Sequence, residues 1–387
     1  MTTRQVKPRG RTTELDRRRL ALEAQRKQDR LQIIKGLRDL ADLEDTPTKA
    51  GRQDASSLRF ASQLLFPDWL TEVPLDLSSH WFVQLRPQGR RVIAIIKNGK
   101  ITLRNKHGRV MDVRREVSLL GKPLGFTMLD CVIDEGTEGV HGPITLHVMD
   151  LIFWDQMEMS ESEADCRHFW LASRFSECPF NDNSEQSIRL IYAPPIDATC
   201  GAIQELYSSA SKTRRFDSFL FTHKSSQYSP GLSPLVLQWR DQKISRYAID
   251  TDDVHGLKFP EMQSVVLRAV RMEGGRITLQ TWDSVVIGTA SEDDLGLKPD
   301  GKDLRLEDSI NDQNDGALDT RTSQEYYLVR GLIRGVAGNG SLLGLSELKI
   351  VPAGRAFPDS FARIQTQAGL RAGTPLVSIR DLLRGVF

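Results

Sequence analysis

Hydrophobic and polar positions between residues 219 and 239 predict two strands joined by a turn-rich loop. The first run, 219–221, is aromatic and aliphatic, which favours a buried strand. The polar stretch that follows contains Pro230, which presets one turn angle, and Gly231, which permits a positive φ. The second run, 235–237, leads to Trp239. Trp239 is therefore predicted at the end of a strand, where a flat aromatic side chain can face a ligand.

Short hydrophobic runs recur through the middle of the chain and predict further strands. The runs 81–85 and 92–96 flank a glycine-containing turn, which predicts a hairpin. The most hydrophobic runs, 126–133 and 144–153, are expected at the centre of a sheet. One helix is expected around residues 199–209. Additional strands are predicted at 244–248, 264–271 and 276–286. Strands outnumber helices, so the predicted class is α+β with mainly antiparallel sheets.

The N-terminal part of the chain has a different pattern. Thr13 and Asp16 resemble a capping box, and scattered Leu and Ile leave a thin helical stripe that ends before Pro47. Residues 1–38 hold 12 Lys or Arg and 4 Asp or Glu, whereas the rest of the chain holds 40 basic and 47 acidic residues. A basic helix with so little apolar surface is expected to fold on an acidic partner.

Two polar stretches are predicted to separate the ordered parts. Residues 46–57 are small and polar, and residues 291–325 are rich in Asp, Glu, Gly and Asn with few aromatics, so both are expected to be linkers. They divide the chain into a basic helix at 1–45, a central domain at 58–290 and a C-terminal extension of unknown role at 326–387.

Composition and motif searches exclude several classes of protein. The four cysteines lack the paired spacing of a zinc site, so they are expected to be buried thiols in a reducing compartment. No apolar run approaches the ~20 residues of a membrane span, so we expect a soluble intracellular protein with no membrane partner. The sequence has no Gly-rich phosphate loop, metal-spaced His/Cys set or triad signature, and no cofactor, metal ion or catalytic residue is predicted.

The segment from His223 to Trp239 resembles the cap-binding segment of the snurportins, adaptors that carry spliceosomal small nuclear ribonucleoproteins into the nucleus. It contains, in order, His-Lys, Tyr-Ser-Pro-Gly and a Pro-Leu-Val strand that leads to tryptophan. Residues 60–77, with Trp69 ahead of Val-Pro-Leu-Asp-Leu, resemble the start of the snurportin core. The basic N-terminal helix resembles an importin-β-binding domain. The resemblance extends over residues 13–250.

This resemblance implies a nucleotidyltransferase-like or mRNA-capping-enzyme-like core that binds the trimethylguanosine cap of small nuclear RNAs. A methylated, positively charged purine is bound by aromatic stacking and cation–π attraction. Trp239 would stack on the purine and Trp69 would lie against the methylated amine. The cations that would pair with the triphosphate are Arg90, Arg91, Lys106 and Lys224.

The position of Trp239 leaves two alternatives open. An ungapped comparison places Gln238 where snurportins have the stacking tryptophan, and Trp239 one residue later. A shift of one residue in a strand reverses the face of the side chain. Either a bulge restores the orientation, or Trp239 belongs to the core. The preferred interpretation is that Trp239 stacks, because Gln238 cannot provide a π surface. Trp81, Trp154, Trp170 and Trp282 are expected in the core.

The N-terminal resemblance implies importin-β as a partner, an exportin for recycling, and shuttling between cytoplasm and nucleus. The residues that would contact importin-β are Arg17, Arg18, Arg19, Arg26, Lys27, Arg30, Lys35 and Arg38. From these residues alone, a nonspecific RNA-binding arm is an alternative.

A further alternative is a capping-type nucleotidyltransferase. Those enzymes use the lysine of a Lys-x-Asp-Gly motif as nucleophile. Here Lys97-Asn-Gly and Lys106-His-Gly are the nearest matches, and neither has aspartate before glycine. We therefore expect a binding protein and not an enzyme.

Overall fold

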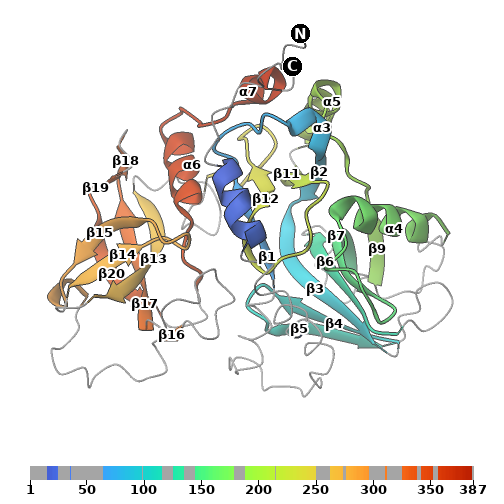
Figure 1. Cartoon of the computed structure of the whole chain (residues 1–387), viewed down its shortest axis with the longest axis horizontal. Helices are drawn as coiled ribbons and strands as arrows, with labels where there is room; N and C mark the ends of the chain where they lie inside the picture. Colours follow the sequence, from blue (N-terminus) through green and yellow to red (C-terminus); the bar gives the residue numbers. More distant parts are fainter. Residues whose placement is uncertain are drawn as a thin grey trace, which may run out of the picture.

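The described strands form three main sheets, and the chain has the predicted α+β class (Figure 1). Among the described strand pairs, β1–β12 and β7–β9 are parallel and the others are antiparallel. The computed structural model describes residues 15–24, 35, 64–97, 99–115, 125–134, 144–177, 188–213, 215–249, 262–272, 276–295, 310–311, 325–337, 341–351 and 356–385.

The first sheet has the strand order β1-β12-β11-β2-β10. Its core contains buried aromatic side chains from neighbouring strands, including Phe219, Phe221 and Trp239. Gly231 has the positive φ predicted for the loop, 84°. The strands are β1 (Leu65–Trp69), β2 (Trp81–Pro87), β10 (Ile196–Asp197), β11 (Phe216–His223) and β12 (Gly231–Trp239), with helices α3 (Leu77–His80) and α5 (Cys200–Thr213) nearby.

The second sheet has the order β5-β4-β3-β6-β7-β8, and β9 pairs with β7. As predicted, two of its most buried strands, β6 and β7, lie inside the sheet. Helix α4 (Ala164–Glu177) packs against β7 and β9. The strands are β3 (Gly89–Lys97), β4 (Lys100–Asn105), β5 (Val110–Arg115), β6 (Thr127–Asp134), β7 (Ile144–Trp154), β8 (Met157–Glu158) and β9 (Ile188–Tyr192).

The predicted hairpin between residues 81–85 and 92–96 is wrong, because β2 and β3 belong to different sheets. The chain passes from one sheet to the other at Gly89, whose φ is 151°. A Cβ atom at this position would lie 1.8 Å from the carbonyl oxygen of Ile133. Gly89 therefore allows a close approach between β3 and β6 that other residues would block.

The C-terminal sheet has the order β15-β14-β13-β17-β16, with β20 on β17. It joins residues on both sides of the predicted boundary at 290, so the strands at 263–290 share a sheet with the C-terminal extension. Its strands are β13 (Gln263–Arg271), β14 (Ile277–Gln280), β15 (Val286–Ala290), β16 (Ile310–Asn311), β17 (Glu325–Ile333) and β20 (Ser346–Val351); β18 (Gly335–Val336) pairs with β19 (Leu342–Leu343).

Two helices connect the C-terminal part to the rest of the chain (Figure 1). Helix α6 (Phe361–Arg371) packs against both β13 and β1. Helix α7 (Ile379–Arg384) packs against α5, and its Leu382 is fully buried in the core of the first sheet. The C-terminal extension therefore folds onto the core.

Two other predictions differ from the structure. Residues 244–248, predicted as a strand, form turns, and Ile244 packs fully buried beside the first sheet. Within the predicted linker at 291–325, residues 293–295 form a short 3-10 helix (η2) with Leu295 buried, and β16 pairs with β17. Local composition missed these tertiary contacts. The linker at 46–57 lies outside the described residues.

Residues 15–24 form a helix that lies against the first sheet. Leu15 is 7% exposed, and its backbone N–H donates to Glu72 over 3.1 Å. Arg18 forms an ion pair with Asp68, and Arg19 donates to Asp76 over 3.3 and 3.4 Å. The helix is therefore held by carboxylates of the central domain. Among the described residues, no helix is both long and apolar enough to cross a membrane.

Candidate functional site

A cavity of about 410 Å³ lies where the first sheet, the second sheet and the C-terminal part of the chain meet. This volume is within the range typical of small-ligand sites. The core contributes mostly strand residues, and the C-terminal part contributes the segment 357–360 and two side chains, Trp282 and Arg363.

The register of the first sheet decides which side chains reach the cavity. Leu220 on β11 pairs with Gln238 on β12 and with Gln84 on β2, and all three side chains line the cavity. The next pair in the register is Phe219 with Trp239. Because successive side chains of a strand point to opposite faces, Phe219 and Trp239 point away from the cavity.

The structure contradicts the prediction that Trp239 stacks on a ligand. The pairing of β11 with β12 is regular over residues 236–239, so no bulge turns this side chain toward the cavity. Trp239 is 4% exposed and packs against Phe219 and Tyr207, at ring-centroid distances of 5.5 and 6.1 Å. Its Nε1–H donates to the carbonyl oxygen of Val377 over 2.8 Å. Trp239 is thus a core residue that anchors the C-terminal segment.

Trp69, the other predicted aromatic contact, does line the cavity. Its side chain is only 5% exposed, and the Arg240 guanidinium carbon lies 5.1 Å from its ring centroid. The neighbouring Asp68 is fully buried and pairs with Arg18. Burial raises the pKa of Asp68, although Arg18 acts to lower it. Most of the Trp69 surface is therefore already covered by protein atoms.

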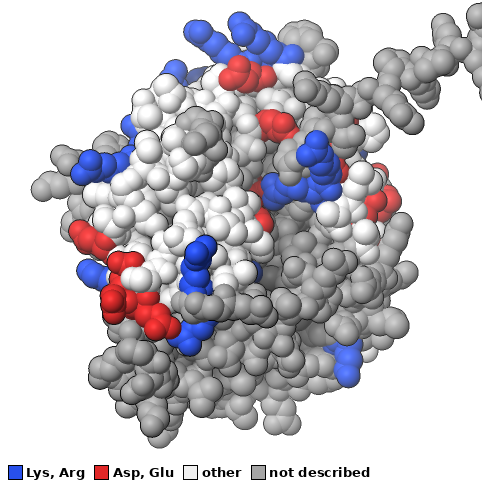
Figure 2. Space-filling view, turned by 60° about the vertical axis from the view of Figure 1, so that its left-hand side comes forward, with Lys and Arg blue, Asp and Glu red and all other residues white. Residues whose placement is uncertain are grey.

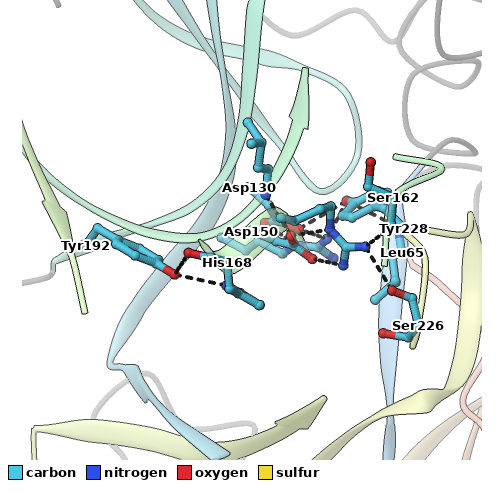
Figure 3. A network of polar contacts seen from close by, with 11 residues as sticks. Leu65, Asp130, Asp150, Ser162, His168, Tyr192, Ser226 and Tyr228 are labelled. Atoms are coloured by element: carbon cyan, nitrogen blue, oxygen red, sulfur yellow. Dashed lines mark hydrogen bonds and ion pairs between the residues drawn. The ribbon is translucent and has the colours of Figure 1, made fainter. Parts of the chain in front are cut away.

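Arg91 lines the cavity as part of a buried polar network (Figure 3). Its Nε donates to Asp130 over 2.9 Å and its Nη2 donates to the Tyr228 hydroxyl over 3.2 Å, while that hydroxyl donates to Asp130 over 3.1 Å. Burial acts to lower the pKa of Arg91, but Asp130 outweighs it, so this pKa is raised and the guanidinium stays charged. The network fixes a cation in the cavity before any ligand arrives.

A second buried pair lies next to the first (Figure 3). Arg167 is fully buried; it donates to Asp150 over 2.8 and 2.9 Å and to the carbonyl oxygen of Ser226 over 2.9 Å. His168 lies 3.1 Å from the Tyr192 hydroxyl through Nδ1. Burial lowers the pKa of His168 to about 4, so its ring is neutral at pH 7. Asp150 and His168 also line the cavity.

Asp217 holds two further cations at the cavity. Arg86 forms an ion pair with this carboxylate, and Arg240 approaches it to 3.0 Å. Burial acts to raise the pKa of Asp217, but Arg240 and Arg86 lower it below its usual value. The carboxylate therefore stays charged at neutral pH and orients both guanidinium groups.

The other predicted cations are only partly assembled at the cavity. Lys106 lines it, on the turn between β4 and β5. Arg90 is exposed and, as the strand neighbour of Arg91, points to the opposite face of β3. Lys224 pairs with Asp197 over 2.7 Å, away from the residues that line the cavity. Arg17, Arg18, Arg19 and Lys35 lie among the described residues of the N-terminal part, whereas Arg26, Lys27, Arg30 and Arg38 lie outside them.

Sequence reasoning missed several side chains that line the cavity. Arg86 and Arg240 each lie at the end of a predicted strand, and strict alternation along the first sheet could have identified them. Trp282 was expected in the core, and no local pattern indicated Phe357 or Arg363. In the part of the chain that the structure describes, no group of His, Cys, Asp or Glu is arranged to hold a metal ion.

A comparison with models of known protein families matches the central part of the chain. Residues 63–241 match the family model described as "Snurportin1, m3G cap-binding domain". These residues contain the core side of the cavity, whereas Trp282, Phe357 and Arg363 lie outside the match.

Solved structures give a weaker likeness. A mycobacterial DNA ligase D complexed with ATP has 13% identity over 75% of this chain and 95% of that chain, with a TM-score of 0.33. A Chlorella virus DNA ligase-adenylate has 11% identity over 73% and 98% of the two chains, with a TM-score of 0.32. Scores this low support no conclusion, and the nucleotidyltransferase-like core stays a prediction.

Proposed function

We propose that this chain, which belongs to the snurportin family through residues 63–241, binds the trimethylguanosine cap of small nuclear RNAs in the cavity described above. The observation that carries the proposal is a cavity, bordered on one side by the matched domain, whose lining includes both aromatic and cationic side chains. A trimethylated guanosine is a positively charged ring with few polar groups left to read. Such a ring is recognised by aromatic faces, and its triphosphate is recognised by arginine and lysine.

The charges of the cavity suit the triphosphate. Its lining includes five cations and three carboxylates, so the cations are in excess: Arg86, Arg91, Lys106, Arg240 and Arg363 against Asp130, Asp150 and Asp359. The Arg91–Asp130 and Arg86–Asp217 pairs hold their guanidinium groups in place, which lowers the entropy lost when phosphate binds.

The same side chains support binding rather than catalysis. Four of the five cations that line the cavity are arginines, which stay protonated at neutral pH and cannot act as amine nucleophiles. Lys106 is an exposed turn residue. We therefore propose that the protein forms no covalent guanylate. Incubation with labelled GTP, followed by denaturing electrophoresis, should show no labelled protein.

The proposal extends to the N-terminal helix, which would link the capped cargo to importin-β for nuclear import. Arg18 and Arg19 already pair with carboxylates on the central domain, which is the chemistry an acidic receptor would offer. On importin-β binding, the helix would exchange these carboxylates for those of the receptor. An exportin would return the protein, which would shuttle between cytoplasm and nucleus.

A titration with cap dinucleotides tests the cap-binding proposal. We expect intrinsic tryptophan fluorescence to be quenched by a trimethylated cap dinucleotide more strongly than by a monomethylated one, with an unmethylated dinucleotide as control. Equal binding of all three, with an affinity that falls steeply with salt, would indicate a general RNA-binding protein instead. On the face that carries the C-terminal sheet, the described Lys and Arg side chains lie in separate groups among acidic and uncharged side chains (Figure 2).

The adaptor role needs a separate measurement. Replacing Arg17, Arg18 and Arg19 with alanine should weaken binding to immobilised importin-β and leave the affinity for the cap dinucleotide intact. Unchanged importin-β binding would count against the role of this helix.

A further inference from the structure

The C-terminal part of the chain supplies a whole wall of the cavity, although it lies outside the family match. Trp282 lies between β14 and β15, and Phe357 lies just before α6; both rings are partly exposed and line the cavity. Their centroids are 6.0 Å apart and their planes differ by 12°. We call these two rings the aromatic wall.

Hydrogen bonds around one carboxylate fix the aromatic wall to its own sheet. Asp359 is 5% exposed; its Oδ2 accepts from the backbone N–H of Val266 over 2.9 Å, and its carbonyl oxygen accepts from the N–H of Trp282 over 2.9 Å. Arg363 pairs with the same carboxylate. The backbone on which both rings stand is therefore held before a ligand binds, as preorganised binding requires.

The aromatic wall also contacts the core directly. Phe66 on β1 lies 5.2 Å from the centroids of both Trp282 and Phe357. The ring of His107, on the turn after β4, stacks on Phe357 at 5.0 Å. Farther along the chain, the Trp239 N–H holds the Val377 carbonyl against the first sheet. These contacts join the C-terminal part to the core both at the cavity and on the opposite face of the first sheet.

The core itself offers little free aromatic surface to a ligand. Gln238 occupies the cavity-facing position beside Trp239. Trp69 is 5% exposed with Arg240 over its ring, and the Arg91 guanidinium carbon lies 5.2 Å from the Phe66 centroid. Trp282 is the partly exposed indole among the residues that line the cavity.

We propose that Trp282, supported by Phe357, is the surface on which the methylated purine stacks, so that the C-terminal sheet determines cap selectivity. This inference rests on the proposed cap-binding function. Trp239 is then a positioning residue, because it holds the C-terminal segment and does not touch the ligand. Tryptophan is the strongest cation–π partner among the aromatic side chains, which favours the charged, methylated base over an unmethylated one.

Calorimetric titration of the full chain with trimethylated and unmethylated cap dinucleotides tests this inference. Trp282→Leu keeps an apolar side chain against Phe66 but removes the π surface. It should weaken binding of the trimethylated dinucleotide by about 5- to 150-fold. Phe357→Leu should give a smaller loss in the same direction. Trp170→Phe, at a partly buried position of α4 that does not line the cavity, is the control and should bind as wild type.

The ratio of the two affinities distinguishes stacking of Trp282 on the purine from a purely structural role of this side chain. If Trp282 stacks on the purine, Trp282→Leu should also reduce the ratio between the two affinities while the melting temperature stays close to that of wild type. An unchanged affinity and ratio in Trp282→Leu, with wild type still binding the cap, would overturn this inference alone. Absence of binding by wild type would overturn the proposed function, and this inference with it.

Discussion

On its core side the cavity is lined by charged side chains that are already paired with one another, whereas on its C-terminal side it is lined by two aromatic rings on two loops that a hydrogen bond joins. Arg91 and Asp130 belong to the first arrangement, and Trp282 and Phe357 belong to the second. The core side orients cations and carboxylates; the C-terminal side presents π surface. Each side therefore suits a different part of a capped nucleotide.

The comparison also separates what sheet register fixes from what packing fixes. On the core side, alternation along neighbouring strands brings Gln84, Leu220 and Gln238 to one face. On the C-terminal side, Trp282 and Phe357 come together only because Asp359 ties two distant loops to β13. The family match ends at residue 241, before either residue of the aromatic wall.

The largest expected loss of stability comes from removing one member of a buried ion pair on the core side of the cavity. Arg91→Ala leaves the buried Asp130 with Tyr228 as its partner, and removing one member of a buried ion pair typically costs about 3–5 kcal/mol. Urea denaturation should show this loss in the free energy of unfolding. Arg90→Ala, on the exposed face of the same strand, should change it by less than about 0.5 kcal/mol. Equal losses would mean that the pair does not stabilise the core side.

A smaller loss of stability is expected from removing the hydrogen bond between Trp239 and Val377, which links the core to the C-terminal segment. Trp239→Phe keeps the ring in the core but removes the N–H that the buried Val377 carbonyl accepts, a loss of about 1–3 kcal/mol. Hydrogen exchange should increase in α6 and α7 of this variant, because the C-terminal segment loses one of its attachments to the core. Trp154→Phe, an equally buried change in the second sheet, is the control. Equally increased exchange of α7 in both variants would contradict the specific role of the Trp239–Val377 hydrogen bond.

The smallest effect is expected where the N-terminal helix meets β1. Arg18→Ala removes the ion pair to Asp68, but the Arg18 side chain is partly exposed to water, so the loss at pH 7 should be about 1 kcal/mol. Because the folded-state pKa of Asp68 is raised, folding binds a proton, and stability rises as the pH falls through that raised pKa toward 3.8. Arg18→Ala raises this pKa further, so its deficit should shrink on acidification.

Urea denaturation at a series of pH values checks this dependence. Arg17→Ala, at an exposed position of the same helix, should show a smaller deficit with no such pH dependence. A deficit for Arg18→Ala that stays constant from neutral to acid pH would show that Asp68 is not the group involved.

Local sequence patterns predicted much of the core side. The alternation of hydrophobic residues indicated β11 and β12, and proline with glycine indicated the turn at Gly231. The same pattern could not choose the face of Trp239, because one residue of register reverses it. It also predicted a hairpin at Gly89, where the chain instead leaves one sheet for another.

Local sequence patterns could not predict the C-terminal side of the cavity, and the reason is physical. Trp282 sits in a hydrophobic run, and such a tryptophan is normally buried. Only the pairing of β13 with β17 and the hydrogen bonds of Asp359 bring it to the cavity. These contacts join residues far apart in sequence, so neither composition nor periodicity records them. The predicted boundary at residue 290 cut through the same sheet.

The bond from Trp239 to Val377 has a practical consequence for anyone who would express residues 63–241 alone. A polypeptide cut at residue 241, where the family match ends, would lack the acceptor for the Trp239 N–H and the buried Leu382 of α7. It would expose part of the apolar core that α7 covers, and its cavity would open to solvent on one side. The stretch that matches the family model is therefore shorter than the stretch whose side chains pack into one core, and the second reaches to α7.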